Sequence, residues 1–311
     1  MPIKLIVNGY YRSGTTFAFK LLQNNLTGFN AYYEPTSSEL PYLIANKKSD
    51  LGLHKHYGYE NLFSSYKEFD QDFILEMFRK SPSLLDGYIK SDTELIDYLD
   101  IFNRQTKNVF LQTNNLSFYL RLLAATYDTK IIHIIRNPLD VYRSIEAVPL
   151  NRRGWVKGKI KTFLNFFGLF LPFGLNKELS YIIKATGMVL GYKSSWKIRL
   201  SIRKKLDSFV VVWVVSNYVA IKAMEANDNS ILLPYEDLIL TPHVGELKLK
   251  KILENYSINI ANKVDISTLK KTRGKGCSVE NFNKLIDKYQ LTEQFEYIKR
   301  RVENSGVNWK I

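Results

Sequence analysis

Residues 4–16 read KLIVNGYYRSGTT, an apolar run followed by two glycines and two threonines. The run predicts a buried strand over residues 3–7, and Thr15 to about Asn24 has the apolar spacing of a helix. A glycine-containing turn between a strand and a helix presents backbone N–H groups that form a cradle for a phosphate. The stretch matches the pattern G-x-x-x-x-G-K-[ST], except that Thr15 stands where the lysine belongs. It therefore predicts a phosphate site without the usual lysine; the alternative is a tight strand-to-helix turn that happens to contain two glycines.

The rest of the chain continues the alternation of strands and helices. Strands are expected at 108–112, 130–135 and 231–233, with helices at about 117–127 and 207–226 between them. Continuous apolar strands joined by helices favour a parallel sheet, because right-handed crossovers place helices on its faces. The sequence therefore predicts an α/β fold, a three-layer sandwich whose central parallel sheet is covered by helices on both faces.

A further helix is expected over residues 69–79, before the chain is broken by Ser81-Pro82. Its apolar residues recur at three- and four-residue spacing, which is typical of one buried helix face. The core positions expected from this spacing are Phe69, Phe73, Ile74, Met77 and Phe78.

Length and composition are those of a globular protein with 311 residues, 45% of them hydrophobic and 24% charged. We expect a single domain over 1–311 with a variable insertion at about 150–205. That insertion is basic at both ends, whereas its centre, 163–175, is apolar and too short to span a bilayer. The net charge of +14 predicts an anionic partner, which could be a nucleotide, a nucleic acid, a sulfated or phosphorylated ligand, or a membrane surface.

The only cysteine of the chain is Cys277, so no intramolecular disulfide can form. A chain without disulfides is typical of a reducing compartment. The strand predicted over residues 3–7 also leaves no room before it for a signal peptide. We therefore expect a cytoplasmic protein.

A second candidate site lies in KIIHIIRNPLDVYRSI, residues 130–145. Arg136 follows a predicted strand, Asn137 and the proline after it suit a helix start, and Ser144 lies two turns into that helix. An arginine at the carboxyl end of a strand stands where open α/β sheets bind ligands. The alternative is that Arg136 pairs with Asp140 and that Ser144 faces solvent.

The two sites together resemble a known family. YRSGTTF (11–17) is similar to the 5′-phosphosulfate loop of the sulfotransferases that use 3′-phosphoadenosine 5′-phosphosulfate (PAPS). Residues 136–144 are similar to their 3′-phosphate motif, an arginine followed eight residues later by a serine. LLPYEDL (232–238) and KKTRGKG (270–276) match further segments in the family order. The resemblance implies the P-loop-like sulfotransferase fold, with PAPS as co-substrate and no metal.

The resemblance also implies which residues hold PAPS. Arg12 takes the position of a cation that stabilises the bridging oxygen as it becomes the leaving group, which would make it catalytic. Phe17 and Tyr235 are candidates to pack beside the adenine, with a place in the core as the alternative. The basic run at 270–275 closes over the 3′-phosphate, unless it is only a solvated surface. The residues implied in PAPS binding are Arg12, Ser13, Gly14, Thr15, Thr16, Phe17, Arg136, Ser144, Tyr235, Arg273 and Lys275.

Sulfuryl transfer needs a base near the acceptor proton. Family members that act on carbohydrates or proteins often place a glutamate about twenty residues after the loop, and Glu34 lies twenty-two after Arg12. We prefer Glu34 over the other candidates, His54 and His56; its alternative is an ordinary surface carboxylate. Other members carry a catalytic lysine or histidine at the end of the strand where this chain has Gln112, which can neither supply a positive charge nor take a proton.

The expected function is transfer of a sulfuryl group from PAPS to a hydroxyl or amine, with release of adenosine 3′,5′-bisphosphate (PAP). The acceptor is expected to be a carbohydrate or glycolipid, and a small molecule stays open. We expect no nucleic acid partner and consider 155–175 a candidate for peripheral membrane contact. The alternatives are a P-loop kinase and a non-catalytic basic protein that binds nucleic acid or a membrane surface. A kinase would carry a Walker lysine and a Mg²⁺-binding aspartate, where this sequence has Thr15 and Arg136.

Overall fold

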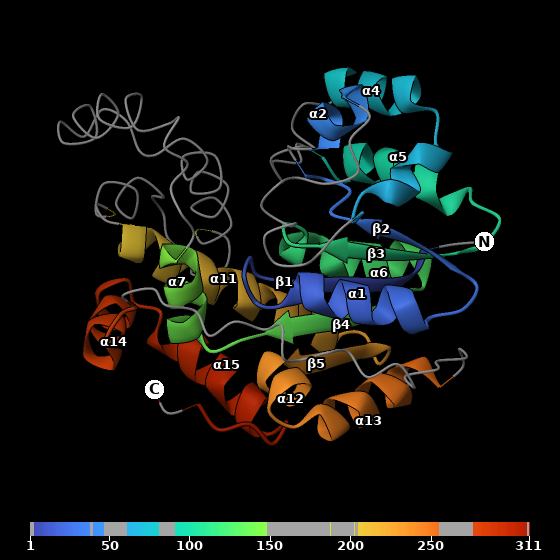
Figure 1. Cartoon of the computed structure of the whole chain (residues 1–311). Coiled ribbons are helices and arrows are strands. Elements are labelled where there is room, and N and C mark those ends of the chain that lie inside the picture. The colour runs from blue at the N-terminus through green and yellow to red at the C-terminus, as the bar shows by residue number, and fades with distance from the viewer. Residues whose placement is uncertain are drawn as a thin grey trace. The chain divides into compact units, whose positions relative to one another are not determined.

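A computed structural model provides the coordinates of the chain (Figure 1). Several predictions lie outside the described residues: those on His54, His56, 155–175, Lys270, Lys271, Arg273 and Lys275. The residues that the structure describes are 3–37, 40–46, 61–80, 91–147, 187, 202, 205–254, 276–309 and 311.

A five-stranded sheet with the strand order β2-β3-β1-β4-β5 forms the centre of the fold (Figure 1). Every neighbouring pair in it is parallel, which confirms the predicted sheet. Strand β2 is not among the predicted strands: it has only five residues and lies at the edge of the sheet, where it pairs with β3 alone. The strands are β1 (Ile3–Gly9), β2 (Phe29–Tyr33), β3 (Asn108–Thr113), β4 (Lys130–Ile135) and β5 (Ser230–Pro234).

Helices cover both faces of the sheet, as predicted. Helix α1 leads from β1 across β3 to β2, whereas α6 leads from β3 across β1 to β4, which is the opposite direction. Right-handed crossovers in opposite directions place their helices on opposite faces (Figure 1). The helices are α1 (Thr15–Asn25), α2 (Leu40–Ala45), η1 (Ser64–Glu68), α4 (Gln71–Lys80), α5 (Asp92–Asn103), η3 (Ser117–Tyr119), α6 (Leu120–Tyr127), α7 (Pro138–Glu146), α11 (Lys205–Glu225), α12 (Tyr235–Ile239), α13 (Pro242–Leu253), α14 (Val279–Lys288) and α15 (Thr292–Glu303).

Helix α4 corrects one prediction about the core. Ile74 and Phe78 are buried as expected, and Phe69 and Met77 are partly buried against the same core. Phe73, however, is 45% exposed. It precedes Ile74 by one position, so it lies about 100° away around the helix and leaves the buried stripe.

The chain divides into two compact units. The first comprises Met1–Arg136, Val219–Lys270 and Arg300–Trp309, and it contains the whole sheet. The second comprises Asn137–Tyr218, Lys271–Lys299 and Lys310–Ile311, and it contains α7 and α14. The insertion at 150–205 stays a prediction, because almost all of it lies outside the described residues.

Helix α11 (Lys205–Glu225) is the one helix of the described residues that is long and apolar enough to cross a membrane. However, 72% of its most apolar window is buried inside the protein. A core helix of a soluble protein passes the same test of length and composition, and the fully buried Trp213 lies on α11. The helix is therefore accounted for by packing within the protein.

Candidate functional site

The loop between β1 and α1 has the predicted form, and its two glycines are required by close contacts. A Cβ atom on Gly9 would lie 2.7 Å from the backbone oxygen of Ile134 on β4. A Cβ atom on Gly14 would lie 2.2 Å from Cδ2 of Tyr235, and Gly14 also has a φ of +94°. Side chains cannot occupy either space, and only glycine adopts positive φ without strain. The glycine pattern of the sequence therefore reflects packing against β4 and against α12.

The polar groups of the loop suit a phosphate. Ser13 is fully buried, and its Oγ has no hydrogen-bond partner within the described part of the chain. Leaving a buried hydroxyl unsatisfied costs about 1–3 kcal/mol, so an anionic oxygen that accepts from it would be favoured. Among the described residues no side chain caps α1, whose N-terminus follows Gly14 directly and attracts negative charge. Phe17, one turn on, is buried in the core, and its contact with adenine stays a prediction.

Arg12 is half-buried and has a φ of +67°. The left-handed conformation is uncommon for a residue with a side chain and costs on the order of 1–3 kcal/mol. Such strain persists only where the surroundings impose it, and it concentrates at functional sites. One constraint is visible, since Nη1 of Arg136 donates to the backbone oxygen of Arg12 at 3.3 Å. Arg12 and Arg136, two of the three arginines predicted to bind PAPS, therefore meet at the loop.

Tyr235 lies between the loop and Arg136. Its ring packs against Gly14, and Cζ of Arg136 lies 4.5 Å from its centroid. This distance is typical of a cation–π contact, which contributes about 0.5–2 kcal/mol. Tyr235 is the first residue of α12, so this short helix reaches the loop.

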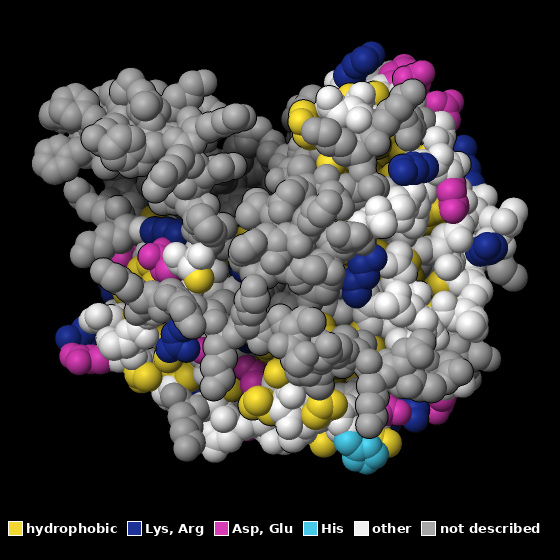
Figure 2. Space-filling model, viewed as in Figure 1, with side chains coloured by type: hydrophobic (Ala, Val, Ile, Leu, Met, Phe, Trp, Pro, Cys, Tyr) yellow, Lys and Arg dark blue, Asp and Glu magenta, His cyan; other side chains and the backbone are white. Residues whose placement is uncertain are grey.

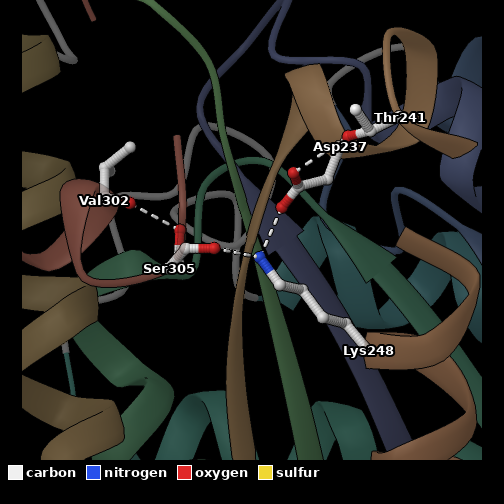
Figure 3. Close-up of polar contacts among 5 residues, drawn as sticks. All are labelled: Asp237, Thr241, Lys248, Val302 and Ser305. Atoms are coloured by element: carbon white, nitrogen blue, oxygen red, sulfur yellow. Dashed lines mark hydrogen bonds and ion pairs between the residues drawn. The ribbon is translucent and has the colours of Figure 1, made fainter. Parts of the chain in front are cut away.

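A buried ion pair holds α12 in place (Figure 3). Asp237 pairs with Nζ of Lys248 on α13 at 2.5 Å, and their side chains are 5% and 21% exposed. Lys248 also donates to the backbone oxygen of Ser305 at 2.7 Å, and Thr241 donates to Asp237 at 3.3 Å. A five-residue helix has little stability of its own. These contacts therefore determine where α12 presents Tyr235.

Replacing Lys248 by methionine should destabilise the protein strongly. The substitution leaves the Asp237 carboxylate buried without its cation, which typically costs about 3–5 kcal/mol. Urea denaturation would measure the loss. The double variant Asp237→Leu/Lys248→Met removes both charges and should recover most of the stability; a double variant as unstable as the single one would contradict this account.

Most of the predicted 3′-phosphate motif, Asn137 to Ser144, lies in the second unit, whereas Arg136 is the last residue of the first segment of the first unit. Asn137 caps α7, since its side chain accepts from the N–H of Leu139 at 2.9 Å. Asp140 pairs with Arg143 at 2.6 Å, and Ser144 is buried rather than facing solvent. Gly276, the last residue of the basic segment at 270–276, has a φ of +58° and lies close to the Arg143 guanidinium. The end of that segment thus adjoins the helix that carries Ser144.

Glu34 immediately follows β2 and adopts a left-handed conformation, with a φ of +44°. Its N–H donates to the backbone oxygen of Gln112 and its own backbone oxygen accepts from Ser37, both at 2.9 Å. Nδ2 of Asn114 donates to its carboxylate. Glu34 is half-buried, and these neighbours orient it. An ordinary surface carboxylate would be exposed and free to change its orientation.

Asn114 connects this carboxylate to the loop. Its Oδ1 accepts from Oγ1 of Thr15 at 2.9 Å and from Nε2 of Gln112 at 3.0 Å. A second link runs from Oγ1 of Thr16 to the Tyr33 hydroxyl at 2.7 Å. Asn114 is not among the site residues predicted from the sequence. Asn114 directly follows β3, at the carboxyl edge of the sheet where open α/β sheets bind ligands, and this position could have indicated a site residue.

A buried row of polar side chains supports the strand ends beneath the loop. Asn8, Thr113 and His133 are register partners on β1, β3 and β4. Nδ2 of Asn8 donates to Nδ1 of His133 at 2.9 Å and to Oγ of Ser117 at 3.1 Å, and its Oδ1 accepts from Thr113 at 3.0 Å. These bonds fix Gly9 and Asn114, which follow Asn8 and Thr113 directly.

No family model matches the chain. An uncharacterized protein of Archaeoglobus fulgidus is 30% identical over 259 residues, which cover 77% of this chain and 80% of the relative. Among the described residues, no group of three or more His, Cys, Asp or Glu side chains could hold a metal ion.

The chain is also similar to solved structures of sulfotransferases, among them these three. The sulfotransferase domain from the curacin biosynthetic pathway is 14% identical with a TM-score of 0.41, and the alignment covers 97% of this chain and 98% of that domain. The sulfotransferase domain of the Synechococcus PCC 7002 olefin synthase is 12% identical with a TM-score of 0.38, covering 92% and 94%. Sulfotransferase STF9 from Mycobacterium avium is 13% identical with a TM-score of 0.43, covering 94% and 77%.

Proposed function

We propose that this chain, which belongs to the same protein family as the uncharacterized Archaeoglobus fulgidus protein, is a sulfotransferase that uses PAPS and releases PAP. The observation that carries the proposal is the link from Thr15 through Asn114 to Glu34. Through this link an oriented carboxylate lies near the glycine loop that we propose binds the 5′-phosphate, and this loop carries Arg12 and no Walker lysine. A base next to the 5′ end of a nucleotide suits transfer to an acceptor hydroxyl or amine.

The residues divide the reaction between them. PAPS supplies a sulfuryl group on an oxygen that bridges sulfur and phosphorus. Glu34 takes the acceptor proton as the acceptor oxygen or nitrogen bonds to sulfur and the bond from sulfur to the bridging oxygen breaks. Arg12 stabilises the charge that this oxygen gains in the departing PAP. Ser13 Oγ and the N-terminus of α1 hold the 5′-phosphate.

Arg136 and Ser144 are proposed to bind the 3′-phosphate of PAPS. Arg136→Ala and Ser144→Ala should weaken PAP binding, whereas adenosine 5′-phosphosulfate, which lacks the 3′-phosphate, should be little affected. A charged hydrogen bond contributes about 1.5–3 kcal/mol, so the arginine substitution should dominate. Calorimetric titration of both nucleotides provides the measurement, and equal losses for both would place the 3′ site elsewhere.

We also propose a carbohydrate or glycolipid acceptor, because Glu34 resembles the base of the family members that act on such substrates. A small-molecule acceptor is the other outcome of an acceptor screen. The described Lys and Arg side chains on the face in Figure 2 are dispersed among acidic and apolar ones.

Two measurements test the proposed function. PAP should bind in EDTA and raise the free energy of unfolding by RT ln(1 + [L]/Kd), because the described residues of the two proposed phosphate sites include no group that could hold a metal ion. Incubation with PAPS and a panel of acceptors should yield a product with an added sulfuryl group in mass spectrometry. Strict metal dependence of nucleotide binding would favour a kinase. Absence of PAP binding, with salt-sensitive binding of DNA or lipid vesicles, would favour a non-catalytic protein.

A further inference from the structure

The backbone of Glu34 departs from what its sequence context favours. A residue before a proline prefers an extended conformation with φ near about −120°, and Pro35 follows Glu34. The observed φ of +44° lies far from that preference. The surroundings must therefore impose it, and the residues that do so control where the carboxylate points.

Two buried tyrosines flank this position. The Tyr66 hydroxyl donates to the backbone oxygen of Tyr33 at 3.1 Å, and the Tyr98 hydroxyl donates to that of Pro35 at 2.5 Å. The accepting carbonyls belong to the residues immediately before and after Glu34. The donors come from two different elements, η1 and α5, so the chain is held on both sides of the strained residue.

Both tyrosines are suited to act as fixed donors. Burial raises the pKa of Tyr66 and of Tyr98 well above the ordinary value, so each keeps its proton. Their rings contact the buried Phe102, with centroids 6.2 Å from it for Tyr66 and 5.6 Å for Tyr98. Close packing leaves these rings little freedom to turn their hydroxyls away.

We propose that Tyr66 and Tyr98 are positioning residues, whose hydroxyls hold Glu34 in its left-handed conformation and so keep its carboxylate at Asn114 for the acceptor proton. The inference rests on the proposed function, in which Glu34 is the base. Neither tyrosine touches the reacting atoms. Each acts through a backbone carbonyl next to Glu34. The hydroxyl donates the hydrogen bond that holds the backbone, and the ring only positions this hydroxyl.

The test is the double variant Tyr66→Phe/Tyr98→Phe, which removes both hydroxyls and keeps both rings. The matched control is Tyr127→Phe, because the Tyr127 hydroxyl is bonded to Asp100 and to the backbone oxygen of Ile96, away from Glu34. Hydrogen–deuterium exchange of the ligand-free protein is followed in the peptide 29–37, with strand 130–135 as the internal reference. PAP release from PAPS and PAP affinity are measured in parallel.

We expect faster exchange in 29–37 for the double variant and not for the control. In turnover, kcat should fall roughly tenfold to 10²-fold, since a small misplacement of a catalytic group has effects of that size. KM for PAPS and PAP affinity should stay within about twofold of the wild-type values, because the substitutions do not change residues that bind the nucleotide. Unchanged exchange in 29–37, or an equal loss of kcat in Tyr127→Phe, would overturn the proposal.

The outcome also separates this inference from the proposed function. If the wild-type protein neither binds PAP nor consumes PAPS, the sulfotransferase proposal fails. Faster exchange confined to 29–37 in the double variant would still support the role of the two hydroxyls at Glu34. If the wild-type protein transfers the sulfuryl group and the double variant does so equally well, the sulfotransferase stands and the positioning role is refuted.

Discussion

Glu34→Gln abolishes sulfuryl transfer and leaves PAP affinity unchanged: this is the result we expect from the geometry at the end of β2. The amide has the size of the carboxylate and its oxygen can still accept from Asn114, so the local structure is kept. It cannot take a proton. Losing a general base costs typically about 10²–10⁴ in rate. PAP release from PAPS gives the rate, and calorimetry gives the affinity.

The control for this variant is Glu68→Gln, which changes an exposed carboxylate of η1 in the same unit. It should leave turnover and PAP affinity close to those of the wild-type protein. If Glu34→Gln retains near-normal turnover while His54→Ala or His56→Ala does not, a histidine supplies the base. Glu34 would then be a structural residue whose strain has another origin.

The parts of the fold that follow from local pattern could be predicted from the sequence. Residues 3–16 carry their strand, turn and helix signals within one short stretch, and the loop formed accordingly. The capping of α7 by Asn137 is likewise a local event. By contrast, β2 is an edge strand of five residues whose identity depends on pairing with β3, more than seventy residues later in the chain.

The same distinction applies to the candidate site. Glu34 was suggested by its spacing from Arg12, but nothing near it in sequence indicates its partner Asn114, which lies 80 residues away. The requirement for glycine at position 14 depends in the same way on Tyr235, which only the folded chain brings to the loop. Sequence patterns therefore predict which residues belong to the site. The hydrogen bonds and packing contacts that join these residues depend on the tertiary structure.

The second large effect is expected at Arg12. Arg12→Ala should lower kcat by about 10²–10³, the range seen when one charge-stabilising donor is removed from a transition state. PAP affinity should fall less, because the negative charge on the bridging oxygen is greatest as the bond breaks. Arg121→Ala, which changes an exposed arginine of α6, is the control and should be neutral.

Arg12→Gly separates the charge of this residue from its conformation. Both Arg12→Ala and Arg12→Gly lack the guanidinium, but alanine keeps the strain of the positive φ, whereas glycine relieves it. Relief of about 1–3 kcal/mol outweighs the entropic cost of glycine, about 0.5–1 kcal/mol, so the glycine variant should be the more stable in urea denaturation. Turnover should be equally low in both, because the charge is absent from both. If Arg12→Gly were to restore turnover, the loop conformation would be the catalytic contribution of this position, and the cation that stabilises the leaving oxygen would have to be Arg136, which already reaches the loop.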